Sequence, residues 1–366
     1  MYRKFLKTFS FIIIFFLTAA AGLVFLFDPF FHYHEPVGPL KAVATKKEYQ
    51  VIGKLRNFEY DSVIVGSSTA ENFNNRWFDD SFGVKSVKII KSSGVTAQLD
   101  YYLQEAFDTG NLKNVYYSLD LFALSGDPEL DFPDESMPLY LYDKNPFNDV
   151  KYLWNKDVIF EDIPYMIATT FLEDYDEGTS YNWAQYKTFS KQEALSHYVR
   201  PEECQEQIKE EEFRENVDGN IDILEYMIKN HPETEFVFFY PPYSLLWWDN
   251  MSRSGLLDQS MYAAKVSMER LLPYENVKLY YFQTEEDIVI DVTKELSGRD
   301  WRDTDTFKFL LAAGNDETAE ALEAGNIVFA SGTASMSVEI KGTDVEKKAE
   351  FGEITFKEPG TYTFVV

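Results

Sequence analysis

The stretch that decides the fold is DSVIVGSSTAE, residues 61–71. Its apolar first half predicts a short buried strand over residues 61–65, and Gly66 permits a tight turn after it. A helix is expected to begin after Ser68. A serine at such a corner lies at the carboxyl edge of a parallel sheet, where open α/β folds place their ligands, and the helix end stabilises a developing negative charge. Ser68 is therefore a candidate nucleophile.

The same residues also fit a purely structural role. Ser68 and Glu71 have the spacing of a capping box, in which the serine caps the helix and the glutamate reaches back to the serine backbone. From the spacing alone, the cap is the favoured interpretation.

Outward from this corner, strands and helices alternate. The apolar patterns predict further strands over residues 84–90, 114–122, 235–240 and 277–282, and helices over 41–58, 96–107, 221–230 and 256–272. A loop-rich, aromatic region runs from Asp127 to about Pro201. Apolar strands separated by helical crossovers predict a parallel α/β sheet covered on both faces.

The pattern changes near residue 290. From Val292 onward the chain consists of short alternating segments, punctuated by Gly, Asp and Pro, with no amphipathic helix. These segments are residues 305–313, 325–332, 334–342, 349–356 and 360–366. This is typical of an all-β, Ig-like sandwich. We therefore expect an α/β domain over residues 28–290 and a β module over residues 291–366.

The N-terminus predicts a membrane anchor. The run from Phe9 to Phe27 carries no charge and, as a helix, is roughly 28 Å long, close to the thickness of a bilayer's hydrocarbon core. Three basic residues precede it, which predicts a cytoplasmic segment over residues 1–8 and export of everything after Phe27. A cleaved signal peptide is the alternative, since Ala19-Ala20-Ala21 offers small residues. The run continues beyond them, which favours a single-pass membrane protein with an extracellular main domain.

Composition narrows the classes of function. The net charge is −27, which argues against binding of nucleic acid and against lying flat on anionic lipid. Cys204 is the only cysteine, so no intramolecular disulfide can form. The only close histidine pair is His32-x-His34, which is not a metal-ligand pattern, and neither a metal nor another cofactor is expected.

Residues 25–290 resemble the membrane-anchored SGNH/GDSL hydrolase-like proteins of Gram-positive bacteria. The resemblance rests on DPFFHYH (28–34), GSSTAENF (66–73), KSSG (91–94), YLYDKNPFND (140–149), FYPPYSLLWWD (239–249) and NVKLYYFQ (276–283). It implies a flavodoxin-like three-layer sandwich and ester hydrolysis or acyl transfer on carbohydrates. It also places Ser68 as nucleophile, with the backbone amides of Ser68 and Gly94 in the oxyanion hole.

The chain departs from the family's pattern at several positions. The usual Gly-Asp-Ser is Gly66-Ser67-Ser68, and an oxyanion-hole asparagine is replaced by Asp120, an anion. No histidine follows His231, so the usual Asp-x-x-His base is missing, and a serine without a base is a weak nucleophile.

The four histidines offer few substitutes for that base. His197, in the loop-rich region, is the one that could reach the sheet edge. His32 and His34 are expected in an aromatic-rich segment at the membrane interface, and His231 at a helix C-terminus, where a cation complements the dipole.

Residues 292–366 resemble a streptococcal-pilin isopeptide linkage domain, through VTKELSGRDW (292–301), TFKF (306–309), FGEITF (351–356) and PGTYTF (359–364). The resemblance places Lys294 at the lysine that forms the isopeptide bond. We expect the module to be incomplete at Val366, so that the bond cannot close and Lys294 is an ordinary solvated lysine. The join near residue 290 is either a natural recombination or a chimeric or fragmentary gene record, and the abrupt end favours the second.

Three functions remain open. The first is an anchored esterase or O-acyltransferase acting on cell-wall or capsular glycans, with a membrane acyltransferase as a possible partner, and with impaired activity. The second is a non-catalytic surface scaffold or adhesin-like protein that carries the pilin-type module. The third is a sugar-binding module that uses Tyr181, Trp183, Trp247 and Trp248, although aromatic clusters are more often packing.

Overall fold

The structure is a computed structural model that describes residues 2–110, 112–188, 191–204 and 206–282, together with strands within 306–313, 335–341 and 362–365. The chain divides into two compact units, residues 1–293 and 294–366. Each unit is described by itself.

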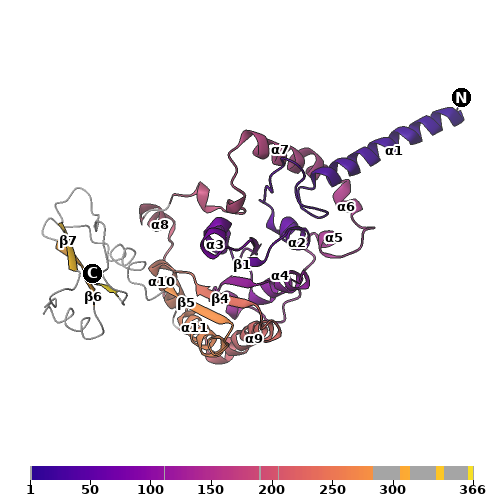
Figure 1. Cartoon of the computed structure of the whole chain (residues 1–366). Coiled ribbons are helices and arrows are strands. Elements are labelled where there is room, and N and C mark those ends of the chain that lie inside the picture. The colour runs from indigo at the N-terminus through magenta and orange to yellow at the C-terminus, as the bar shows by residue number, and fades with distance from the viewer. Residues whose placement is uncertain are drawn as a thin grey trace. The chain divides into compact units, whose positions relative to one another are not determined.

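The first unit is built on a five-stranded parallel sheet (Figure 1). Its strand order, β2-β1-β3-β4-β5, is the flavodoxin-like order of doubly wound folds. The predicted parallel α/β architecture is therefore confirmed. The strands are β1 (Ser62–Gly66), β2 (Ser86–Ile90), β3 (Asn114–Ser118), β4 (Glu235–Tyr240) and β5 (Val277–Tyr281).

Strand β3 ends earlier than its apolar pattern predicts. The expected strand ran from residue 114 to 122, but the sheet ends at Ser118. The amide of Leu119 still bonds the carbonyl of Phe239 on β4, and the amide of Asp120 then turns back to the carbonyl of Ser118. This turn carries Asp120 across the carboxyl edge of the sheet.

Helices cover the two faces of the sheet unequally. On one face α9 contacts both α4 and α11, and α2 packs against α4 and the edge strand β2. The hydroxyl of Tyr240, on β4, points to this face and bonds the carbonyl of Ala264 on α11. These helices are α2 (Lys47–Asn57), α4 (Thr96–Asp108), α9 (Glu210–Asn230) and α11 (Leu257–Leu271).

The opposite face is covered more thinly. It carries α3 (Asn75–Phe82), which packs beside β2, and Phe73, whose ring contacts Phe239 of β4. Towards the β5 edge this face opens, since Tyr280 is exposed.

Helix α2 begins later than the pattern over residues 41–58 predicts. The amides of Thr45 and Lys46, just before the helix, both donate to the side-chain oxygen of Gln50 in its first turn. These two bonds fix the start of the helix. Residues 41–44 are therefore not part of the helix. They lie beside the loop-rich region, where the amide of Lys41 donates to the hydroxyl of Thr170.

The N-terminal helix α1 (Tyr2–Phe27) is long and apolar enough to cross a membrane, a test that a signal sequence also passes. After it the chain folds around Asp28. The Asp28 carboxylate is buried and accepts the amides of His32, Tyr33 and His34 and the hydroxyl of Tyr152. Burial raises the pKa of Asp28.

The region from 127 to 201, expected to be loop-rich, contains more helix than the sequence suggested. Helix α7 (Ile163–Leu172) was missed, although Pro164 at its first turn favours a helix start. Helix α10 (Leu245–Arg253), which follows β4, was missed as well. The short helices are η1 (Ala70–Asn72), η2 (Ala123–Ser125), α5 (Leu139–Tyr142), α6 (Val150–Leu153), η3 (Val158–Asp162), η4 (Glu177–Thr179), η5 (Ala184–Tyr186) and α8 (Lys191–His197).

The second unit contains an antiparallel sheet in the order β7-β6-β8. Its strands are β6 (Thr306–Ala313), β7 (Ser335–Lys341) and β8 (Tyr362–Val365), each within a predicted segment. The segments expected over residues 325–332 and 349–356, and the position of Lys294, lie outside the described residues.

Candidate functional site at the carboxyl edge of the sheet

The corner after β1 requires glycine because of crowding. A Cβ on Gly66 would lie 2.8 Å from Cβ of Ala70 and 2.9 Å from Cβ of Ser118 on β3. The predicted tight turn is present, but no α-helix follows it directly. Only the 3-10 turn η1 intervenes before α3 begins at Asn75.

A buried carboxylate lies directly above this corner. Asp120 Oδ2 accepts a hydrogen bond from Ser67 Oγ at 2.6 Å, and Oδ1 accepts one from the Tyr243 hydroxyl, also at 2.6 Å. The hydroxyl of Thr69 lies 3.2 Å from Oδ2. Asp120, Ser67, Thr69 and Tyr243, which we call the Asp120 cluster, come from the ends of three neighbouring strands, β1, β3 and β4.

The cluster surrounds a carboxyl group that is out of contact with water. Asp120 is only 1% exposed, and burial raises its pKa, while the hydroxyls of Ser67, Tyr243 and Thr69 act in the opposite direction. Burial and the neighbouring Asp120 raise the pKa of Tyr243. Tyr243 therefore stays a donor, and each carboxylate oxygen has a hydroxyl partner.

Ser68, the predicted nucleophile, is not among the hydrogen-bond partners of this carboxylate in the described part of the chain. Its carbonyl accepts the indole N–H of Trp183 at 2.9 Å, and within the described residues its Oγ has no hydrogen bond. Neither a carboxylate nor an imidazole is bonded to it.

The capping-box interpretation of Ser68 is wrong. Glu71 does not reach back to Ser68, because its buried carboxylate instead accepts Lys47 Nζ at 2.6 Å and Ser92 Oγ at 2.8 Å. An ion pair with α2 and a bond to the loop after β2 have replaced the local cap. The Ser68 hydroxyl is therefore not part of a capping box, and its role as nucleophile stays a prediction.

Gly94, expected in the oxyanion hole, lies in the loop after β2. Its amide donates to the carbonyl of Lys91 at 2.9 Å, so the donor is already engaged in a turn. A Cβ there would lie 2.8 Å from that carbonyl oxygen, which explains the glycine without catalysis.

None of the four histidines, all of which lie in the described part of the chain, is bonded to the Asp120 cluster. His197 is exposed on α8 and pairs with Glu193 at 2.8 Å, one helical turn away. His32 pairs with Asp149 at 3.3 Å, and His34 bonds the carbonyls of Phe25 and Glu35.

His231 does not have the charged role expected of it. It caps the C-terminus of α9, but its ring stacks on Phe107 with centroids 3.5 Å apart. Burial lowers its pKa, which disfavours the cation that was expected to complement the helix dipole.

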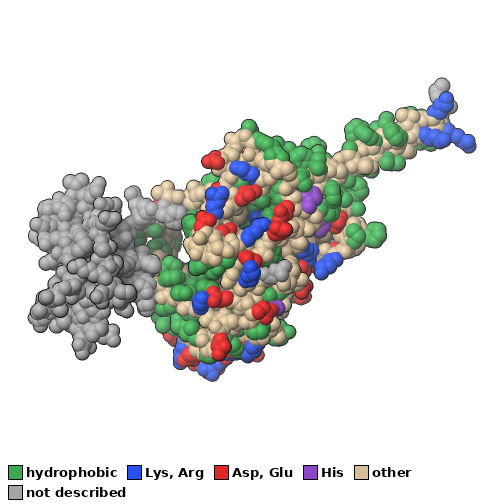
Figure 2. Space-filling model, viewed as in Figure 1, with side chains coloured by type: hydrophobic (Ala, Val, Ile, Leu, Met, Phe, Trp, Pro, Cys, Tyr) green, Lys and Arg blue, Asp and Glu red, His purple; other side chains and the backbone are tan. Residues whose placement is uncertain are grey.

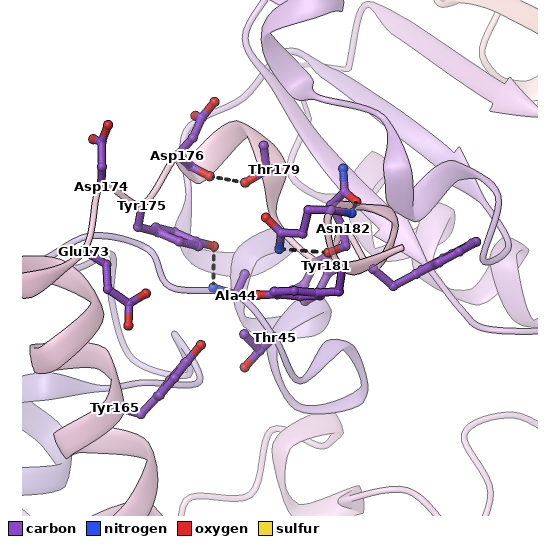
Figure 3. A pocket seen from close by; sticks show the side chains of 13 residues that line it. Ala44, Thr45, Tyr165, Glu173, Asp174, Tyr175, Asp176, Thr179, Tyr181 and Asn182 are labelled. Carbon is purple, nitrogen blue, oxygen red and sulfur yellow. Dashed lines mark hydrogen bonds between the residues drawn. The ribbon is translucent and has the colours of Figure 1, made fainter. Parts of the chain in front are cut away.

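A cavity of about 430 Å³ is lined in part by Trp183, whose indole N–H donates to the Ser68 carbonyl. Figure 3 shows side chains that line this cavity. Its aromatic lining includes Tyr181, which lies almost wholly buried, and its rim is acidic. Figure 3 shows the hydroxyl of Tyr175 turned to the backbone of Ala44, whose amide donates to it at 3.0 Å. The aromatic lining is Tyr165, Tyr175, Tyr181, Trp183 and Tyr186, and the acidic side chains are Glu173, Asp174 and Asp176.

The four aromatic residues proposed for sugar binding are divided by the fold. Tyr181 and Trp183 line the cavity, whereas Trp247 stacks on Tyr243 with ring centroids 4.1 Å apart and packs edge-on against Trp248. The two tryptophans of α10 therefore support the Asp120 cluster and do not line the cavity.

Sequence reasoning missed three members of the cluster, Ser67, Thr69 and Tyr243. Ser67 and Thr69 flank the predicted Ser68, so strand alternation could have pointed to them. No pattern in the sequence singled out Tyr243.

Among the described residues, no group of three or more His, Cys, Asp or Glu could hold a metal ion.

Comparison with known proteins identifies only the C-terminal part. Residues 290–366 match the family model of FctA, the Spy0128-like isopeptide containing domain. No curated protein matches the chain. The family match does not reach residues 25–289, so the SGNH-like resemblance of that part is not supported by it.

Proposed function

We propose that this chain is a membrane-anchored, cell-surface protein in which a non-catalytic α/β domain carries a pilin-type β module. The apolar helix α1 supports the anchor, and the isopeptide-domain match of residues 290–366 supports a location at the cell surface. The β module supplies the adhesin-like or structural part of this role.

One observation carries the non-catalytic assignment. The Asp120 carboxylate, which bonds the neighbouring Ser67, also accepts the hydroxyl of Tyr243, while Ser68 Oγ is bonded to no base within the described residues. A serine hydroxyl is a weak nucleophile unless a base removes its proton. Ser67, which does bond Asp120, is 1% exposed and closed to a substrate.

A second candidate keeps the chemistry that the resemblance implies, an esterase or O-acyltransferase acting on cell-wall or capsular glycans. The observation that favours it is an aromatic cavity lined by Trp183, whose indole N–H donates to the carbonyl of Ser68. In that case a partner, such as a membrane acyltransferase, would have to supply the base that Ser68 lacks.

A fluorophosphonate probe decides between the two when it is applied both to the purified chain and to native membranes, where a partner that completes the site would be present. We expect no labelling of the full chain in detergent or lipid, because activated serines react and unactivated ones do not. Ser68→Ala and Ser67→Ala are the matched variants, and a known serine hydrolase in the same tube is the positive control. Labelling of the unaltered chain that disappears in Ser68→Ala would establish the enzyme and overturn the scaffold.

A further inference from the structure

Large apolar side chains are exposed on one segment beside the N-terminal helix. The segment comprises α6, η3, α7 and the turn before them, residues 147–172, and we call it the platform. Phe147, Phe160 and Leu172 are 86%, 76% and 84% exposed. Figure 2 shows green, apolar side chains along α1 and around its base. The exposed apolar residues of the platform are Phe147, Val150, Trp154, Phe160, Tyr165, Phe171 and Leu172.

The platform packs against the outward half of α1. Both α6 and η3 contact that helix, and the indole N–H of Trp154 donates to the carbonyl of Leu17 at 2.8 Å. On α1, Ala20 and Ala21 are half-buried and Val24 is fully buried, which marks one face of the helix as a packing surface. Small residues on such a face let neighbouring backbones approach closely.

The length of α1 decides where this packing takes place. The hydrocarbon core of a bilayer is about 30 Å thick, and the run from Phe9 to Phe27 is roughly 28 Å long, so the whole run is needed to span it. If residues 17–27 stood clear of the membrane, only residues 9–16 would remain inside, about 12 Å of helix. The part of α1 that the platform contacts therefore lies in the outer half of the bilayer.

We propose that the platform is a second membrane contact, immersed in the outer leaflet. The inference rests on the anchor of the proposed function. It implies that the α/β domain is held at a fixed orientation on the lipid surface and does not swing on a single-helix tether.

Most charged groups of the platform are paired, which lowers the cost of immersing them. Asp149 is paired with His32 and with the hydroxyl of Tyr33, and Asp162 is paired with Lys46 at 2.6 Å. Lys156 and Asp157 are paired with each other at 3.6 Å. Lys151 and Glu161 are exposed, and the long stem of Lys151 can extend towards the headgroups.

Site-specific labelling tests the proposal on the full chain. The exposed Cys204 is replaced by serine, and single cysteines are introduced as Phe160→Cys and Leu172→Cys, with Phe82→Cys on α3 as the matched control. Phe82 is 61% exposed and α3 is not among the elements that contact α1. Thermal melting of each variant checks that it is folded.

The chains are placed singly in phosphatidylcholine nanodiscs and treated with a water-soluble maleimide. Labelling at positions 160 and 172 should be at least about ten-fold slower than at position 82, because the acyl region excludes water. A fluorophore at position 172 should be quenched by nitroxide-labelled lipid, and one at position 82 should not. Equal labelling at all three positions overturns the proposal, and so does protection without quenching, which would mean that protein covers the face.

A failure of the anchor can be distinguished from a failure of the platform by mass spectrometry. Intact mass of the nanodisc sample shows whether residues 1–27 are present. A chain cleaved near Ala21 would refute the anchor, and the same cysteines would then be tested on the cleaved chain with added vesicles. If positions 160 and 172 of the cleaved chain were labelled as fast as position 82 in the presence of vesicles, the platform proposal would be overturned as well.

Discussion

At the scale of single residues, two buried lysines are the most unusual feature of the α/β domain. Lys88, on β2, is 1% exposed, and its ammonium donates to the carbonyls of Glu71 and Ser180. Burial lowers its pKa to about 7, helped by the nearby Lys54. The ammonium of Lys54 lies over the rings of Phe31, Phe58 and Tyr181, and burial lowers its pKa to about 8.

These lysines should make stability rise with pH. A lysine titrates near 10.4 in the unfolded chain, so between about pH 7 and that value the unfolded state binds more protons than the folded state. The cost of burial is complete below about pH 7 and is relieved as the pH rises. Each proton contributes a slope of at most about 1.4 kcal/mol per pH unit.

We predict that Lys88→Met flattens this dependence. Chemical unfolding from pH 7 to 9.5 should show stability rising more steeply for the unaltered chain than for the variant. The exposed Lys144→Met is the control and should keep the original slope. Parallel curves for the Lys88→Met variant and the unaltered chain would show that Lys88 is not held in a costly environment.

At the scale of elements, the contact between α2 and the segment after the anchor decides how the membrane helix joins the domain. Gly53, in α2, lies against the backbone of residues 30–31, so a Cβ would come within 2.4 Å of the Phe30 carbonyl oxygen and 2.6 Å of that of Phe31. The carbonyl of Phe31 also accepts the side chain of Asn57, which fixes its position.

We predict that Gly53→Ala destabilises the domain by about 1–3 kcal/mol, the usual cost of overpacking a filled interior. Glycine to alanine within a helix is otherwise favourable by roughly 0.5–1 kcal/mol. Gly22→Ala, in α1, is the matched control because nothing lies within 4 Å of the position its methyl would take. Thermal unfolding of both variants measures the difference. A stabilised Gly53→Ala variant would refute the close approach.

At the scale of the whole molecule, the fate of α1 decides whether the domain stays on the membrane. The helix continues without a break through Ala19–Ala21 to Phe27, and beyond it the buried Asp28 ties three following amides into the fold. Cleavage after Ala21 would require this helix to open within its apolar run.

We predict that the mature protein keeps residues 1–27. Intact mass and extraction of membranes with alkaline carbonate should find the whole chain in the pellet. A control chain with residues 1–27 replaced by a cleavable secretory signal should be released. Release of the unaltered chain, with a mass that lacks the first 21 residues, would contradict the anchor.

The sequence by itself determined the features that have a local cause. Apolar runs and their spacing predicted the five parallel strands, three of the helices that cross between them (α4, α9 and α11), the helix α2 before the sheet and the long N-terminal helix, because such patterns recur within a few residues. The corner at Gly66 was predicted for the same reason.

Only the tertiary structure decided the roles of the site residues. Asp120 meets Ser67 and Tyr243 across 53 and 123 residues of chain, and Glu71 prefers a lysine on α2 to the serine that a capping box would offer it. The platform likewise joins α1 through a contact between Trp154 and Leu17, 137 residues apart. A buried polar group takes whichever partner the fold brings within reach, and spacing along the chain does not reveal which one that is.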